Sequence, residues 1–232
     1  MKKKIYYTIV TIFLLSITMS QCKCSKGKPK APDVDISKVD LTFYRFDREF
    51  QQNDTFNTKA EMQALQKKYN SFYDVYIYKL MRFAEPNDSS DDIYTYINYF
   101  FMYRDMIQLY QMTQKAFPNT DANDEEIRRA FAYSKMYLPQ LQLPKKVVYC
   151  ISGLNAAAFT IDADYAGIGL DMYLNKDTLY NQIFPNYIAA RLRKEMMCQN
   201  VMKAIYNYQY NDPYATSGAL INNIIQVGKQ QY

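Results

Sequence analysis

Apolar residues recur every three or four positions through much of the first half of the chain, a spacing that predicts amphipathic helices. We expect a first helix to begin at a capping box formed by Thr58 and Glu61, whose side chains can accept hydrogen bonds from free amide groups. It should end at Glu85-Pro86, because the residue before a proline disfavours the helical conformation. The apolar face of this helix comprises Met62, Leu65, Tyr69, Phe72, Tyr76, Leu80 and Phe83.

Two further helices are predicted before residue 140. The stretch NDSSDD, residues 87–92, offers several N-caps and places acidic groups at the positive end of a helix. The second helix closes near Pro118, and its apolar positions are Ile93, Ile97, Phe100, Ile107 and Tyr110. Asp124 can cap a third helix, which ends before Pro139. The residues of this helix that face the core are Ile127, Phe131 and Leu138.

Runs of β-branched and aromatic residues predict strands in two other parts of the chain. Residues 39–46, VDLTFYRF, alternate in the manner of a strand. Residues 145–152, KKVVYCIS, form an apolar strand, and residues 156–161, AAAFTI, could pair with it across Gly153-Leu154-Asn155. The run AGIGLDMYL, residues 166–174, supplies a third strand in this region.

The remainder returns to helical patterns, and together these patterns predict one α+β domain that is mainly helical. Residues 178–210 form helices interrupted near Pro185 and Arg193, and Ser217 begins a last helix that carries Leu220, Ile221, Ile224 and Ile225. The domain spans residues 37–232. It comprises a helical layer at 54–140, then a small sheet near 145–174 with helices over 141–232. The last apolar face runs to within one turn of Tyr232, so we expect the domain's C-terminal part to be missing.

The first 21 residues have the pattern of a secretion signal. Three lysines precede an apolar run from Ile5 to Met19, which is shorter than the roughly 20 residues that a membrane-spanning helix needs. Cys22 follows at once, in the position where bacterial export systems attach acyl chains such as palmitate, and Cys24 is close by. An ordinary cleaved signal with two incidental cysteines is the alternative. We expect lipidation at Cys22 to hold the protein to a membrane.

Residues 22–36 resemble a tether, since they are rich in Lys, Pro, Gly and Ser. Its lysines could also contact anionic headgroups. Lys23, rather than the aspartate that favours retention in the inner membrane, follows Cys22, so the outer membrane, facing the periplasm, is the expected location and the inner membrane the alternative.

The formal charge of +5 comes from these terminal segments. They hold seven lysines and two aspartates, Asp33 and Asp35, so 21 basic and 21 acidic residues remain in residues 37–232. Nucleic-acid binding is therefore excluded, because no basic stripe remains for a phosphate backbone. Two further cysteines, Cys150 and Cys198, lie in apolar runs and are expected to be separate buried thiols rather than a disulfide. The 24 tyrosines are expected at half-buried positions, with a sugar-binding surface as the alternative.

The stretch TIDADYAGIGLDMYL, residues 160–174, concentrates candidate chemistry. Asp162, Asp164 and Gly167 match three positions of an EF-hand loop, but Tyr173 stands where a bidentate glutamate is required. Another calcium site, built from Asp162, Asp164 and Asp171, remains an alternative, and no other cofactor is expected.

A structural interpretation of the same stretch is preferred. Asp162 and Asp164 form a polar turn between two strands. Gly167 and Gly169 lie two apart and face one side of a strand, where missing side chains let another backbone approach. That approach is either internal packing or the addition of a partner strand.

Four segments stand out as a set: YRFDREF (44–50), VVYCISGLNAAAFTID (147–162), GIGLDMYL (167–174) and IFPNYIAARLRKEMM (183–197). Together they resemble the GldB family of gliding-motility lipoproteins. The resemblance runs from the leader to Tyr232, and members usually extend further. It implies a lipid-anchored periplasmic protein whose partners are cell-envelope proteins of gliding or the associated secretion.

The family is similar in turn to predicted zinc peptidases with an H-E-x-x-H helix, which implies a degenerate zincin-like domain. Zinc hydrolysis needs imidazole ligands, and this chain has no histidine. Glu195 and Gln199 in the matching helical region, and Gln226 further on, do not replace them. We therefore expect no zinc site and a non-enzymatic scaffold or binding module. The alternatives are a hydrolase that uses Asp162, Asp164 or Asp171, and a tyrosine-lined glycan-binding protein.

Overall fold

The computed structural model describes residues 32–52, 56–86, 90–174, 180 and 182–210. The chain divides into two units, Met1–Asp33 and Val34–Tyr232, and all elements below belong to the second. The predicted leader, most of the tether and the helix expected from Ser217 lie outside the described residues.

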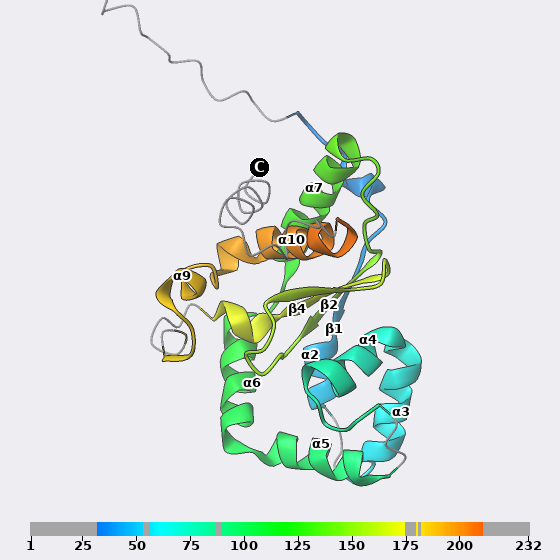
Figure 1. The fold of residues 1–232 in the computed structure, drawn as a ribbon, viewed down its shortest axis with the longest axis vertical. Coiled ribbons are helices and arrows are strands. Elements are labelled where there is room, and N and C mark those ends of the chain that lie inside the picture. Colours follow the sequence, from blue (N-terminus) through cyan, green and yellow to red (C-terminus); the bar gives the residue numbers. More distant parts are fainter. Residues whose placement is uncertain (1–31, 53–55, 87–89, 175–179, 181, 211–232) are drawn as a thin grey trace, which may run out of the picture. The chain divides into compact units, whose positions relative to one another are not determined.

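A four-stranded sheet forms the centre of the second unit (Figure 1). Its order is β1-β2-β4-β3, where the strands are β1 (Thr42–Arg45), β2 (Lys146–Cys150), β4 (Tyr165–Gly169) and β3 (Ala158–Ile161). β2 pairs in parallel with both β1 and β4, and β3 pairs antiparallel with β4. The predicted pairing of residues 156–161 with β2 is therefore wrong. The short turn at residues 162–164 joins β3 to β4 instead, which leaves the apolar β2 in the interior of the sheet.

One face of the sheet is covered by aromatic helical segments (Figure 1). These are α2 (Phe46–Gln51), α3 (Thr58–Tyr69), α4 (Ser71–Asp74), the π-helix η2 (Val75–Leu80) and α5 (Asp92–Met102). The apolar face predicted for the first helix, residues 58–85, is confirmed at five of its residues, which are buried: Met62, Leu65, Tyr69, Phe72 and Tyr76.

The single first helix predicted over residues 58–85 is divided into three segments. Asn70 has a positive φ of 47°, and this residue separates α3 from α4. The predicted capping box is also wrong, because Asn57 is the N-cap. Thr58 lies inside the helix, and its hydroxyl donates a hydrogen bond to Asn98 Oδ1 at 2.7 Å.

The opposite face is covered by longer helices, α6 (Arg104–Ala116), α7 (Asp121–Tyr137) and α10 (Met197–Gln209), together with the short 3-10 helix η1 (Ile36–Lys38). The second predicted helix is split into α5 and α6 at Tyr103, whose ψ of 121° is extended. Thr120, rather than Asp124, is the N-cap of α7. Ile127 and Phe131 are buried as predicted, whereas Leu138 is 37% exposed and is not a core residue.

The chain after β4 departs from the predicted strand. Residues 170–174 do not continue it, because the 3-10 helix η3 (Leu170–Tyr173) begins directly after Gly169. The short helix α9 (Asn186–Ala189) and the 3-10 helix η4 (Lys194–Met196) then lead to α10, which confirms the interruptions near Pro185 and Arg193. The fold is mixed and mainly helical, as predicted. In the described part, no helix has the length and apolar character needed to cross a membrane.

Candidate functional site

Asp171 is a buried anchor for the loop that follows β2. Its carboxylate accepts hydrogen bonds from the Ser152 amide at 2.7 Å, the Ser152 hydroxyl at 3.1 Å and the Leu154 amide at 2.6 Å. Gly153 and Leu154 both have a φ of 62°, which curls the loop around the carboxylate. Burial raises the pKa of Asp171, and the three hydrogen bonds oppose that rise. The contacts assign Asp171 a structural role.

Asp162 and Asp164 lie elsewhere, exposed in the turn between β3 and β4. This is the polar turn that the sequence predicts, and Asp162 has a φ of 49° there. No group of three or more His, Cys, Asp or Glu side chains among the described residues is placed to hold a metal ion. The structure therefore does not assemble Asp162, Asp164 and Asp171 into one calcium-binding or catalytic group.

The two glycines of β4 permit close packing within the chain. A Cβ atom on Gly167 would lie 2.2 Å from the ring of Phe159, and one on Gly169 would lie 2.2 Å from the carbonyl oxygen of Ala156. The predicted close approach is thus internal. Both edges of β4 are paired, with β2 and β3, so the addition of a partner strand to β4 is wrong.

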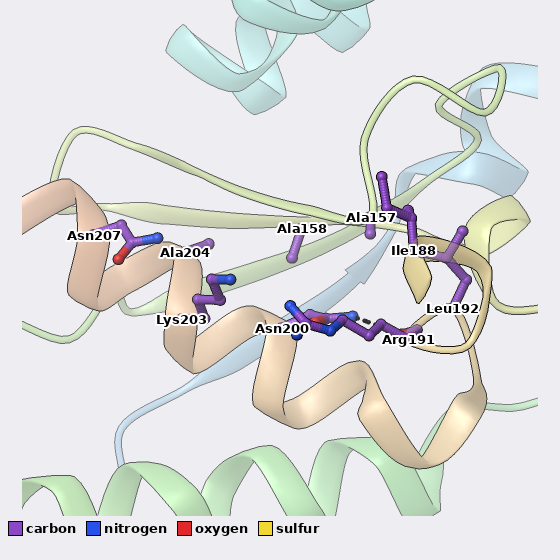
Figure 2. A pocket seen from close by; sticks show the side chains of 9 residues that line it. All are labelled: Ala157, Ala158, Ile188, Arg191, Leu192, Asn200, Lys203, Ala204 and Asn207. Carbon is purple, nitrogen blue, oxygen red and sulfur yellow. Dashed lines mark hydrogen bonds between the residues drawn. The ribbon is translucent and has the colours of Figure 1, made fainter. Parts of the chain in front are cut away.

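A cleft of about 290 Å³ lies between the start of β3 and α10 (Figure 2). Residues three, four and seven apart share one side of a helix, and in α10 this side carries Asn200, Lys203, Ala204 and Asn207. Ala157 and Ala158 present only methyl groups from the strand side, and the small Ala204 faces the cleft from the helix. The remaining lining residues, from α9 and the segment after it, are Ile188, Arg191 and Leu192.

The cleft is positively charged. Arg191 and Lys203 are its two charged lining residues, and none of the nine lining residues is acidic. Within the described residues, neither cation has an ion-pair partner. Desolvation and the nearby Arg191 lower the pKa of Lys203. Such a site favours a negatively charged ligand group that would compensate both cations.

Asn200 fixes the wall of the cleft in place. Its amide nitrogen donates to the Tyr173 hydroxyl at 3.0 Å and to the Arg191 carbonyl oxygen at 3.3 Å. These bonds tie α10 both to η3 and to the segment that carries Arg191. The geometry of the cleft therefore depends on ordered contacts between three elements.

Sequence reasoning did not identify this cleft. The residues singled out in the matching region, Glu195 and Gln199, are exposed and are not among its lining residues. The sequence feature that could have identified the cleft is the recurrence of the polar residues Asn200, Lys203 and Asn207 at spacings of three and four. The buried positions of the same helix are Met197, Cys198, Val201 and Ile205.

Cys150, Cys198 and several tyrosines belong to the core. Cys150 and Cys198 are free and buried, as predicted, and burial raises the pKa of both thiols. The fully buried tyrosines are Tyr69, Tyr76, Tyr149, Tyr173 and Tyr180. An exposed group does exist on and after α5, where Tyr96, Tyr99 and Tyr103 are 52%, 63% and 61% exposed.

Residues 27–232 match the family described as gliding motility protein GldB. No curated protein and no solved structure matches the chain.

Proposed function

The chain belongs to the family of the gliding motility protein GldB, and from this premise we propose that it acts as a non-enzymatic binding module for the gliding machinery. Family membership makes it a gliding-associated lipoprotein of the cell envelope. The proposal adds a molecular role, which is to hold a partner protein at the cleft between β3 and α10.

The cleft is the observation that carries this role. Its lining combines two cations, two side-chain amides and short apolar groups, which together can bind and orient a ligand. Beside the arginine, the lining contributes one titratable group, the amine of Lys203, and none of the nine lining residues is a His, Asp, Glu, Cys or Tyr that could act as a further acid or base. This composition supports binding in preference to hydrolysis.

Attachment through Cys22 is the second part of the proposal. Acyl chains on this residue would hold the protein at the outer membrane, on its periplasmic side, and the segment to residue 36 would act as a tether. A Cys22→Ser variant should leave the membrane fraction after removal of the leader. If that variant stays fully membrane-bound, attachment through Cys22 is wrong.

Photo-crosslinking in living cells tests the binding role. A photoreactive residue replaces Lys203 in one variant and Lys135, an exposed residue of α7, in a matched control. We expect the first variant alone to form adducts with envelope proteins of gliding or the associated secretion, identified by mass spectrometry. Equal adducts from both positions, or none with such proteins, would contradict the proposal, as would hydrolysis of peptides or glycans by the purified protein.

A glycan-binding role is a second candidate, favoured by the exposed tyrosines. Tyr96, Tyr99 and Tyr103 follow one another at spacings of three and four, so their rings can offer a shared stacking surface. Replacing all three with alanine should abolish binding to purified envelope polysaccharide. Absence of polysaccharide binding by the unaltered protein would remove this candidate.

A further inference from the structure

β3 has one open edge. It is the last strand of the sheet, and among the described residues it pairs only with β4. The Gly169 amide donates to the Ala157 carbonyl oxygen at 3.1 Å, which identifies these two residues as a hydrogen-bonded pair. Because such pairs alternate along an antiparallel ladder, the backbone groups of Ala158 and Thr160 point away from β4. An edge of this kind is a template for another strand.

A hollow lies at each end of β3. The positive cleft includes Ala157 and Ala158 at the start of the strand. A second hollow of about 510 Å³ includes Thr160, Ile161 and Asp162 at its end. The hydroxyl of Thr160 is buried and has no hydrogen-bond partner in the described part of the chain. The strand edge and both hollows therefore provide polar groups that a ligand running along β3 could engage.

The two hollows differ in charge. Arg191 and Lys203 line the first without an acidic residue. The second contains Asp74 and Asp162 beside Lys79. A ligand that follows β3 thus meets positive charge at the start of the strand and predominantly negative charge at its end.

We propose that β3 accepts an extended peptide segment of a partner protein as a fifth strand, with a carboxylate of that segment against Arg191 and Lys203. The inference rests on the proposed binding role and names its class of partner. An extended peptide supplies the alternating amide and carbonyl groups that Ala158 and Thr160 present toward the open edge. A small anion alone would compensate the cations but leave that edge unpaired.

The length of the strand sets the length of the segment. Four residues at about 3.3 Å each extend over roughly 13 Å, so a segment of about five or six residues would reach both hollows. An antiparallel segment would bring its carboxyl-terminal end to the positive cleft. The carboxylate can then come from an acidic side chain or from a chain terminus.

Selection from a random peptide library against the acylated full chain in detergent micelles tests the inference. Selected peptides should contain β-branched residues and a carboxylate near one end. In fluorescence anisotropy, replacing that carboxylate with an amide should weaken a selected peptide about tenfold, and N-methylation of alternate backbone amides should abolish its binding. Comparing free with amidated peptide ends distinguishes a terminal carboxylate from a side chain.

Two protein variants locate the binding surface. Ala158→Pro removes an amide that already points away from the sheet, a change that edge strands tolerate, and it should abolish peptide binding with the fold retained. Lys203→Met should weaken binding about tenfold, whereas Lys135→Met on α7 should not change it. Circular dichroism verifies the fold of each variant.

Several results would overturn the inference. These are no enrichment from the library, selected peptides without a carboxylate, or unchanged affinity in a folded Ala158→Pro variant. Tighter binding of a synthetic peptide of residues 211–232, or self-association that Ala158→Pro abolishes, would assign the edge to this chain's own tail or to a second copy. If peptides fail to bind while crosslinks at position 203 still identify gliding proteins, the peptide class is wrong and the binding role stands.

Discussion

The two faces of the sheet solve the same packing problem differently. On the α2–α5 face, aromatic rings fill the space, and the ring of Phe159 occupies the gap above Gly167. On the α10 face, the core closes over β2 and β4, but a positive cleft remains beside β3.

The difference separates residues that hold the fold from residues available to a ligand. Phe46 is fully buried and its ring centroid lies between 4.8 and 5.3 Å from those of four neighbours, which are Phe50, Tyr69, Phe72 and Tyr76. Lys203 and Arg191 instead lack ion-pair partners within the described residues. Substitutions at four places in the fold test how far this separation holds.

The largest effect is expected at the centre of the aromatic face. Phe46→Ala removes a ring that contacts four others, and it should lower the free energy of unfolding by about 3–5 kcal/mol because a cavity remains. Urea denaturation followed by circular dichroism measures the loss. A loss below about 1 kcal/mol, the typical cost of an average substitution, would mean that this face is no better packed than the other.

Substitutions of the two glycines of β4 should have the next largest effect on stability. Gly169→Ala places a methyl group against the Ala156 carbonyl oxygen, a backbone atom that cannot turn aside, and should cost about 1–3 kcal/mol. Gly167→Ala meets the ring of Phe159 instead, so a second change, Phe159→Leu, should restore part of its loss. Melting temperatures of the single and double variants compare the two sites. Equal rescue at both glycines would contradict the distinction between backbone and side-chain contact.

Asp171→Asn tests the anchor of the loop that follows β2. The side chain of asparagine has one acceptor oxygen where the carboxylate has two. One buried backbone N–H, of Ser152 or Leu154, therefore loses its acceptor, and the protein should lose about 1–3 kcal/mol of stability. Because burial raises the pKa of Asp171, the native state holds its proton to higher pH than the unfolded state does. Its contribution to stability therefore falls as pH rises from the ordinary value of 3.8 to the raised pKa.

Denaturation across that pH range measures the difference between the two proteins. The fall should be smaller in the Asp171→Asn variant than in the unaltered protein, because Asp124, whose pKa burial also raises, titrates in both. Parallel curves for the two proteins would contradict the assignment of a raised pKa to this carboxyl group.

The smallest effect on stability is expected from filling the cleft. Ala204→Leu adds a larger side chain to open space, so the free energy of unfolding should change by no more than about 0.5 kcal/mol. Crosslinking from position 203 should nevertheless disappear. A large change in stability would show that the cleft belongs to the core, and would contradict the difference between the two faces of the sheet.

Local sequence patterns predicted most elements but not how the strands associate. The segments at 42–45, 146–150 and 158–161 were identified as strands because β-branched and aromatic residues mark them. Parallel partners leave no turn between them, so no local signal could place β1 beside β2 or β4 between β2 and β3.

The pattern of apolar residues along the chain could not reveal the helix boundaries or the cleft. The apolar stripe continues unchanged past Asn70, and only the left-handed backbone of that residue divides the helix. Thr58 has the spacing of a cap, but the hydroxyl bonds to Asn98, a residue of another helix. Likewise, Arg191 and Lys203 become one site only when the segment after α9 folds beside α10.

The parallel pairing of Thr42 with Lys146 also has a consequence for the order in which the chain folds. When the polypeptide emerges amino end first, β1 has no strand to join until the second half of the chain is present. Completion of the sheet must then wait for a long loop to close, which slows the final step of folding. During that delay the residues of β1 have no neighbouring strand to supply their backbone hydrogen bonds.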